Sequence, residues 1–237
     1  MAAHVTARQR AREQITAEIL DAARRQLAEQ GAGALSLRSI ARDLGMVSSA
    51  VYRYVDSRDE LLTQLIVEAY DSLGETTEAD VAGTAGHPSA ERWTSAAATI
   101  RRWAHARPHE YLLLYGSPVP GYDAPPTTVG PGTRATRALL SIVGDAAAAG
   151  QLAPPATDPE LPAELVADLA RLGELVDLTV DAGTWVAIVA AWTQLFGLVS
   201  FELTSQTRGL VEQHEALFLA TARLGARQIG LSSPAPA

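Results

Sequence analysis

Four polar side chains lie close together in the first quarter of the chain and have the chemistry of a surface that contacts nucleic acid: Ser48, Ser49, Tyr52 and Arg53. On a helical wheel of about 100° per residue they point to one side, while the apolar residues of the segment point to the other. The small hydroxymethyl groups allow close approach to base edges, and the phenol and the guanidinium can reach phosphates and guanines. A helix over 48–54 is too short to be stable alone, so neighbouring helices must support its apolar side.

The preceding residues supply such a neighbour. Ser36 can cap a first short helix whose apolar positions 37, 40, 41 and 44 share one face, and Gly45 ends it. Two short helices joined by a glycine-containing turn, with a small polar outer face on the second, are typical of a helix-turn-helix. A longer helix over 12–30, and another that follows the possible cap Asp56 to residue 73 or beyond, frame the pair.

The stretch 35–62, LSLRSIARDLGMVSSAVYRYVDSRDELL, resembles the DNA-binding domain of the tetracycline-repressor (TetR) family, whose pattern covers residues 15–66. The resemblance implies that the second helix approaches DNA at its start and that the recognition helix begins at Ser48. It also implies that Tyr52 occupies the family's near-constant aromatic position. With the wheel, it predicts DNA contacts by Ser36, Arg38, Ser48, Ser49, Tyr52, Arg53, Tyr54 and Arg58.

Two positions depart from the family pattern. Val47 stands where many members have a hydroxyl that caps the recognition helix, which leaves that role to Ser48. Arg58 stands where members usually have Lys, which keeps the charge but changes the hydrogen-bond geometry. Tyr54 has two open interpretations, because the wheel places it towards the core whereas the family implies a phosphate contact.

Charge is unevenly distributed along the chain. The formal net charge is −8, and all 19 basic residues are Arg. Residues 1–60 hold nine Arg against eight Asp or Glu, whereas the remainder holds ten against nineteen, so the acidic excess lies away from the helix-turn-helix. Arg8, Arg10 and Arg12, spaced two apart, indicate either a mobile basic arm that adds phosphate contacts or an ordinary solvated terminus.

Beyond residue 58 the apolar pattern stays helical. Helices are expected up to Pro108, over 109–115, and again over 133–150, 159–175, 184–203 and 210–229. Five Pro and three Gly in 117–132 predict a loop there. The expected fold is all-α: a three-helix helix-turn-helix DNA-binding domain with a basic arm over 1–57, a larger helical effector-binding and dimerisation domain over 58–230, and a disordered tail over 231–237.

The segment 185–203 is nearly all apolar. Thr193, Gln194, Ser200 and Glu202 interrupt it, and the sequence holds no second such segment, so a membrane span is disfavoured. A helix that is apolar most of the way round lies in a core or at an oligomer interface, and small residues in this one favour a homodimer built as a four-helix bundle with the last helix. The residues expected at that interface are Ala190, Gly197, Ser200, Leu217 and Leu224.

Aromatic and polar residues of the larger domain are the candidates for a ligand pocket, although each type is also common in cores and on surfaces. Their composition favours a hydrophobic or aromatic small molecule. No carboxylate or thiol cluster completes a metal site with His105 and His109, and no metal or cofactor is expected. The pocket candidates are Trp93, Arg101, Trp103, His105, Tyr111, Tyr115 and Trp192.

A narrower resemblance lies in the same part of the chain. The run 115–122, YGSPVPGY, followed by Trp192 and by 197–203, GLVSFEL, is similar to the C-terminal domain of a TetR subgroup named for a Trp-His-Gly signature. Here Phe196 stands where His would precede the Gly. This resemblance implies no particular ligand.

Two functions follow as hypotheses. The first is a ligand-responsive transcriptional repressor that binds a palindromic double-stranded DNA operator as a homodimer and is released by a small-molecule effector. The second is a helical small-molecule-binding protein or an enzyme without DNA binding. The chain has no Cys, no Gly-rich phosphate loop after a strand and no G-x-S-x-G elbow, so the sequence favours a regulator that is not an enzyme. The absence of Cys and of an apolar leader predicts a cytoplasmic location.

Overall fold

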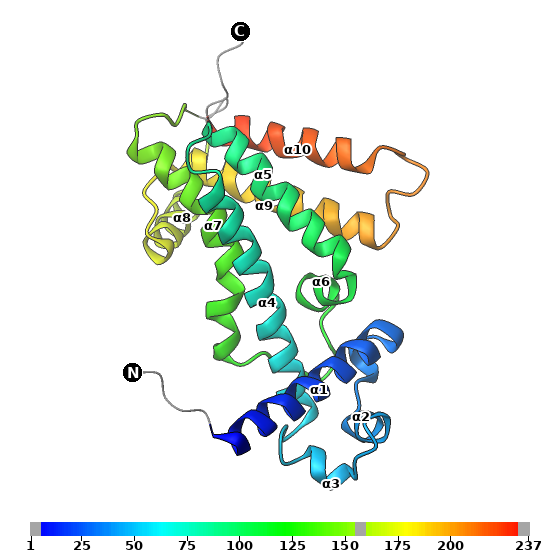
Figure 1. The fold of residues 1–237 in the computed structure, drawn as a ribbon. Coiled ribbons are helices and arrows are strands. Elements are labelled where there is room, and N and C mark those ends of the chain that lie inside the picture. The colour runs from blue at the N-terminus through cyan, green and yellow to red at the C-terminus, as the bar shows by residue number, and fades with distance from the viewer. Residues whose placement is uncertain (1–5, 155–159, 232–237) are drawn as a thin grey trace. The chain divides into compact units, whose positions relative to one another are not determined.

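The computed structural model describes residues 6–154 and 160–231, and every regular element in them is a helix (Figure 1). This confirms the predicted all-α class. The helices, in chain order, are α1 Ala7–Gln30, η1 Ala32–Ala34, α2 Leu37–Asp43, α3 Ser48–Val51, α4 Arg58–Gly83, α5 Ser89–Ala106, α6 Pro108–Tyr115, η2 Pro126–Thr128, α7 Val129–Ala148, α8 Ala163–Val176, α9 Ala182–Leu203 and α10 His214–Ile229.

The chain folds into two compact units that are not continuous in sequence. One, here called the head, comprises residues 1–71 and 107–132, and the other, here called the body, comprises 72–106 and 133–237. Their bounds differ from the functional division at residues 57 and 58, which stays a prediction. Of the predicted tail, 232–237 lie outside the described residues, while the Leu231 amide donates to the Ala226 carbonyl at 2.9 Å and its side chain is buried.

The head begins with a capped helix instead of an arm. Thr6 Oγ1 accepts a hydrogen bond from the Gln9 amide at 3.2 Å, which starts α1 at Ala7. Arg8, Arg10 and Arg12 therefore belong to a helix, and the expectation of a mobile arm at these positions is wrong. Residues 1–5, the rest of that predicted arm, lie outside the described residues.

A single apolar cluster holds the head together. Ile19 and Leu27 from α1, Ile40 from α2 and Leu61 and Leu65 from α4 are buried in it, and Val51 of α3 reaches it with no exposed surface. Burial of one large aliphatic side chain is worth about 1.5–3 kcal/mol, so this cluster, and not helix propensity, holds the four-residue α3 in place.

The turns between these helices follow local rules. Ser36 Oγ caps α2 by accepting from the Ser39 amide at 3.4 Å, and Gly45, with φ of 65°, ends the helix. The cap before α4 differs from the sequence expectation: Ser57 Oγ, and not Asp56, accepts from the Glu60 amide at 3.0 Å.

Two helix bounds also differ from expectation. Regular α-helical geometry in α3 ends at Val51, and the chain continues to Tyr54 in turns. Helix α7 starts at Val129, inside the predicted loop, because Pro131 falls in the first turn of a helix, where a missing N–H breaks no helical hydrogen bond.

The body is built around α9 and α10, with α5 packed on α10 and α8 packed on α9. Trp93 and Phe218 are fully buried in its core. Gly225 allows α9 and α10 to approach closely, since a Cβ at this position would lie 2.9 Å from the Ala191 Cβ. The body therefore has a tightly packed core beneath any surface that α9 and α10 present.

Candidate nucleic-acid interface

The outer side of the second short helix presents side chains with no partner in the described residues. Ser48, Ser49 and Arg53 are exposed, and Tyr52 is 45% exposed. Val47 occupies the N-cap position of α3 and, as expected for a side chain without a hydroxyl, makes no capping hydrogen bond. The Ser48 hydroxyl does not cap the helix in its place. Both hydroxyls remain available to an external acceptor or donor.

The start of α2 adds a positively charged side chain to the head. Arg38 is exposed and makes no hydrogen bond or ion pair within the described residues. The Ser36 hydroxyl, by contrast, is engaged as the α2 cap, and the Ser36 amide donates to the Gln26 Oε1 atom at 2.8 Å. The structure thus leaves Arg38 free for a ligand and gives Ser36 a role in fixing the helix that carries it.

Tyr54 and Arg58 are engaged inside the head. Tyr54 is half-buried and packs against the apolar cluster, as the helical wheel predicts. Arg58 Nη2 donates to the Ala32 carbonyl at 3.0 Å and lies 3.4 Å from the Gly33 carbonyl, which ties the start of α4 to η1. A DNA contact by either residue stays a prediction, and for Arg58 it would compete with these bonds.

A basic hollow beside α3 was not anticipated from the sequence. Arg8 and Arg12 on α1 line it together with Arg53 and Tyr54, and the Arg12 guanidinium lies 5.6 Å from the centroid of the Tyr54 ring. Arg8 and Arg12 are four residues apart, so they share one face of α1. That spacing is visible in the sequence once Thr6 is recognised as a cap.

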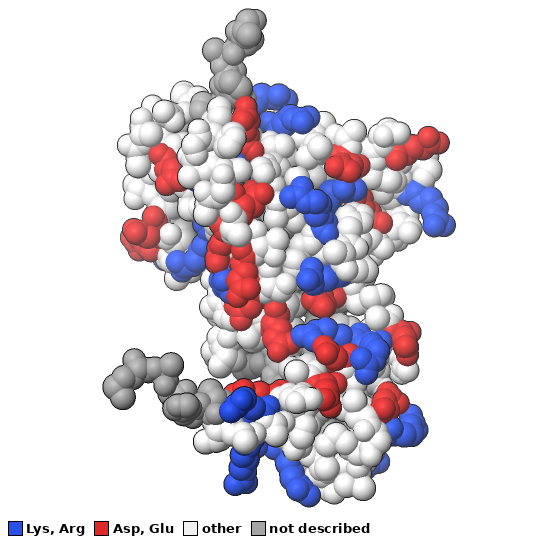
Figure 2. All heavy atoms as spheres, in the orientation of Figure 1, with Lys and Arg blue, Asp and Glu red and all other residues white. Residues whose placement is uncertain are grey.

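Figure 2 shows where the charges gather. Basic side chains project from the edge of the head that carries α1 and α3, whereas acidic side chains form a band along α4. A cationic edge on an acidic protein localises the attraction for a polyanion to that edge. On the face drawn, basic side chains therefore lie at the edge of the head that carries α1 and α3.

The seven predicted pocket residues are divided between the two units. Tyr111 and Tyr115 belong to the head, where their rings lie 5.0 Å apart and Tyr115 meets the edge of Tyr70 at 6.2 Å. Burial raises the pKa of the Tyr115 phenol above its usual range. The other five lie in the body, so the seven do not form one pocket within either unit.

In the body, Arg101 and His105 meet at a residue that was not predicted as a site residue. The Glu202 carboxylate, whose side chain is 3% exposed, accepts at Oε2 from Arg101 Nε at 2.9 Å and lies 2.7 Å from His105 Nε2. The Arg101 guanidinium also lies over the Phe218 ring, 5.8 Å from its centroid. This charged cluster joins α5, α9 and α10.

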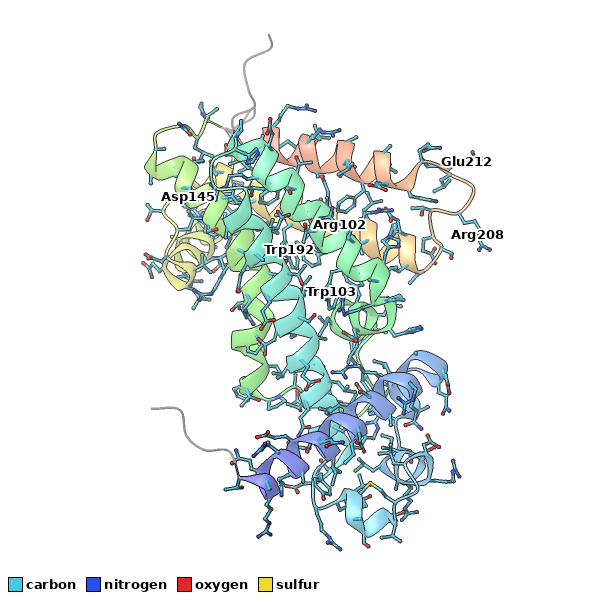
Figure 3. The ribbon with its side chains drawn as sticks, in the orientation of Figure 1. Arg102, Trp103, Asp145, Trp192, Arg208 and Glu212 are labelled. Carbon is cyan, nitrogen blue, oxygen red and sulfur yellow. The ribbon has the colours of Figure 1, made fainter. Side chains whose placement is uncertain are left out.

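The three tryptophans among the candidates differ in environment. Trp103 is buried and donates to Ser72 Oγ at 3.0 Å, while the fully buried Trp93 is a core residue. Trp192 on α9 is half-buried, its ring lies 4.9 Å from Phe196, and its Nε1 is buried without an acceptor in the described residues (Figure 3). Trp93 Nε1 is likewise buried without an acceptor in the described residues, so of the three only Trp192 combines an unpaired N–H with a partly exposed ring.

The predicted dimer residues lie on a partly uncovered apolar surface. On α9, Val189 is 40% and Phe201 57% exposed, and a Cβ at Gly197 would meet nothing within 4 Å. On α10, Leu224 is 44% exposed. By length and composition α9 is the one helix of the described chain that could cross a membrane, yet only 28% of its most apolar window is buried within the subunit. Ala190, Ser200 and Leu217 are half-buried.

Among the described residues, no group of three or more His, Cys, Asp or Glu is placed to hold a metal ion. The two histidines considered in the sequence are not joined: His105 meets Glu202, and His109 is an exposed residue in the first turn of α6.

The chain is similar to known regulators over most of its length. Residues 19–65 match the family model for bacterial regulatory proteins of the tetR family, and residues 93–224 match that for a tetracyclin repressor-like C-terminal domain. The HTH-type transcriptional regulator Rv1816 of Mycobacterium tuberculosis is 41% identical over 200 residues, 84% of this chain and 85% of that protein. Mb1846 of Mycobacterium bovis, another HTH-type transcriptional regulator, gives the same values.

Solved structures agree with the sequence comparisons. The crystal structure of SCO4313 matches with a TM-score of 0.72 and 34% identity, covering 93% of this chain and 98% of that one. A protein from Rhodococcus sp. RHA1 shares the fold with a TM-score of 0.69 and 22% identity. The narrower Trp-His-Gly resemblance stays a prediction beside these matches.

Proposed function

Since this chain belongs to the TetR family of bacterial transcriptional regulators, and is a DNA-binding protein and not an enzyme, we propose that it is a cytoplasmic repressor. In this proposal a homodimer binds a palindromic operator, and a small hydrophobic or aromatic effector releases it. The observation that carries the proposal is the set of exposed, unpartnered side chains on α2 and α3: Arg38, Ser48, Ser49, Tyr52 and Arg53.

These side chains suit a major groove. Small hydroxyl residues at the start of α3 let its backbone approach base edges, and the larger Tyr52 and Arg53 extend further along the same side. The basic hollow lined by Arg8, Arg12 and Arg53 lies beside that helix and would receive a phosphate. Phosphate contacts position the head, so base reading falls to the residues at the start of α3.

The homodimer is supported by the outer face of α9 and α10. Val189, Phe201 and Leu224 leave apolar surface exposed to solvent in one subunit, at a cost of roughly 25 cal/mol per Å². A second copy that places the same helices against this face would cover it and form a four-helix bundle. The open position at Gly197 allows the two backbones to approach closely.

An effector site in the body is supported by Trp192. Its indole N–H is buried without an acceptor among the described residues, as is that of the core residue Trp93, and a buried unpaired donor costs about 1–3 kcal/mol. Trp192 differs from Trp93 because its side chain is only half-buried. A ligand with a flat apolar ring and a hydrogen-bond acceptor would both stack on this side chain and satisfy the N–H. To release the operator such a ligand must favour the non-binding state by a few kcal/mol, which is roughly a hundredfold difference in affinity.

The test is selection of bound duplexes from a random DNA pool at moderate salt, followed by the stoichiometry of the complex. We expect enrichment of an inverted repeat bound by two subunits. Arg38→Ala with Tyr52→Ala should weaken operator binding by about a hundredfold or more, because each lost contact is worth about 1–3 kcal/mol and occurs in both half-sites.

Arg223→Ala is the matched control for charge, since Arg223 is an exposed residue of α10 in the body. It should leave the affinity unchanged. Retained operator affinity in the double variant, or no enriched sequence from folded protein, would refute the proposed reading surface.

A further inference from the structure

A tight turn in the predicted loop holds two side chains next to each other. The Tyr122 amide donates to the Val119 carbonyl at 3.1 Å, Pro120 and Gly121 are the central residues, and Gly121 has φ of 75°. Proline followed by a residue with positive φ is the arrangement of a type II turn. Such a turn holds its first and last residues close together, so Val119 and Tyr122 are presented as a pair. We call residues 119–122 the turn clip.

Two side chains of the turn clip contact the helix-turn-helix core. Val119 and Tyr122 are half-buried and pack against the apolar cluster that also buries Val51 of α3. The Tyr122 hydroxyl lies 3.0 Å from Thr63 Oγ1 on α4. Thr63 Oγ1 donates its single proton to the Asp59 carbonyl at 2.9 Å, so Tyr122 is the donor in its bond to Thr63.

The helix before the turn clip is fixed to the head as well. Leu113 of α6 packs against the same cluster, and Tyr111 is fully buried. Arg24 of α1 lies 3.7 Å from the Glu110 carboxylate of α6. The whole segment 107–132 thus belongs to the head, although in sequence it lies between body segments, and α7 continues from it into the body.

We infer that the turn clip is a positioning element for DNA reading: Val119 and Tyr122 hold the packing of α3 on the head core in its DNA-competent arrangement. The inference rests on the proposed function, because it assigns part of the operator affinity to residues that touch no DNA. A head with a loosened core populates the competent arrangement less, and its apparent affinity falls by that fraction.

The test compares three variants. Tyr122→Phe removes only the hydroxyl, Tyr122→Ala removes the whole phenol ring, and Tyr70→Phe is the matched control. Tyr70 is a half-buried head residue whose hydroxyl has no hydrogen bond among the described residues. Affinity for the selected inverted repeat and for a random duplex is measured by fluorescence anisotropy, at a temperature where urea titration shows each variant fully folded.

Operator affinity should fall about three- to tenfold for Tyr122→Phe, as expected for one lost hydrogen bond, and further for Tyr122→Ala. Affinity for the random duplex should stay constant, because phosphate attraction does not need the exact packing of α3. Thr63→Val should weaken operator binding like Tyr122→Phe, and the double variant should be no worse than either single one. Tyr70→Phe should have no effect.

Amide hydrogen exchange separates this inference from the proposed function, since it needs no DNA. Exchange of the amides in 48–55 should be at least tenfold faster in Tyr122→Ala than in wild type, while exchange in α9 stays unchanged. A variant that exchanges like wild type over 48–55, or that loses stability while the ratio of operator to random affinity stays constant, would overturn the positioning role. Failure of wild type to bind any selected duplex would instead refute the proposed function.

Discussion

Replacing Glu202 by Gln tests the charged cluster that joins α5, α9 and α10. The substitution keeps the shape of the side chain and one acceptor oxygen but removes the negative charge. Two groups then lose the negative charge that they face: Arg101, whose side chain is 15% exposed, and His105, which is 40% exposed. The remaining acid near Arg101 is Glu215, 3.8 Å away and 75% exposed, so solvent screens it.

The expected loss of stability is about 2–3 kcal/mol. Removing one partner of a fully buried ion pair costs about 3–5 kcal/mol, and a hydrogen bond to a charged group is worth about 1.5–3 kcal/mol. The Gln oxygen retains part of the bond to Arg101, which lowers the cost. Its amide nitrogen, however, would sit where Glu202 Oε1 is buried with no partner among the described residues, which adds an unsatisfied donor.

Urea unfolding at fixed protomer concentration measures this difference, because the proposed dimerisation would make the midpoint depend on concentration. Glu215→Gln is the matched control. As the exposed acid of the same cluster it should change the free energy of unfolding by less than about 0.5 kcal/mol. A Glu202→Gln protein within that margin of wild type, or a Glu215→Gln protein destabilised as much as Glu202→Gln, would refute the assignment of Glu202 as the centre of the cluster.

Three further predictions concern helix packing, self-association and pH. Gly225→Ala should destabilise the body by about 1–3 kcal/mol, because the new Cβ would lie 2.9 Å from the Ala191 Cβ. Gly197→Ala should stabilise the subunit by up to about 1 kcal/mol yet weaken self-association in sedimentation experiments, and unchanged association would contradict the proposed dimer face. The bidentate hydrogen bond from Arg134 lowers the pKa of Glu78, so its contribution to stability is present above the ordinary pKa of 4.5 and is lost as pH falls through the lower folded value. Glu78→Gln should lose this acid dependence of the urea midpoint, and an unchanged pH profile would contradict it.

Structural features that depend on residues close together in the sequence could be predicted. The periodicity of 37–44, the Ser36 cap and the Gly45 stop located the helix-turn-helix, because helix faces and caps are local properties. Arg8 and Arg12 were misplaced for an equally local reason. The Thr6 side chain caps α1, which places both residues, four apart, on one face of that helix and not in an arm.

Contacts between distant segments could not be read in this way. Arg58 binds carbonyls of η1, Glu202 meets residues about a hundred positions earlier in the chain, and Tyr122 donates to Thr63. None of these pairs leaves a periodic pattern in sequence. Residue type alone does not show which side chains meet in space, and two of the seven pocket candidates, Tyr111 and Tyr115, fold into the head instead of the body.

The interrupted sequence of the head has a consequence for synthesis. Residues 1–71 emerge from the ribosome well before 107–132, yet both contribute to one apolar cluster. Until Tyr122 has emerged, the nascent helix-turn-helix lacks the cover that Val119 and Tyr122 give its apolar cluster, and its completion waits for contacts of high sequence separation. A fragment that ends at residue 57, the boundary predicted from the sequence, would lack the contacts of Val119 and Tyr122 with this cluster. A transplantable DNA-binding module of this protein must therefore carry both segments.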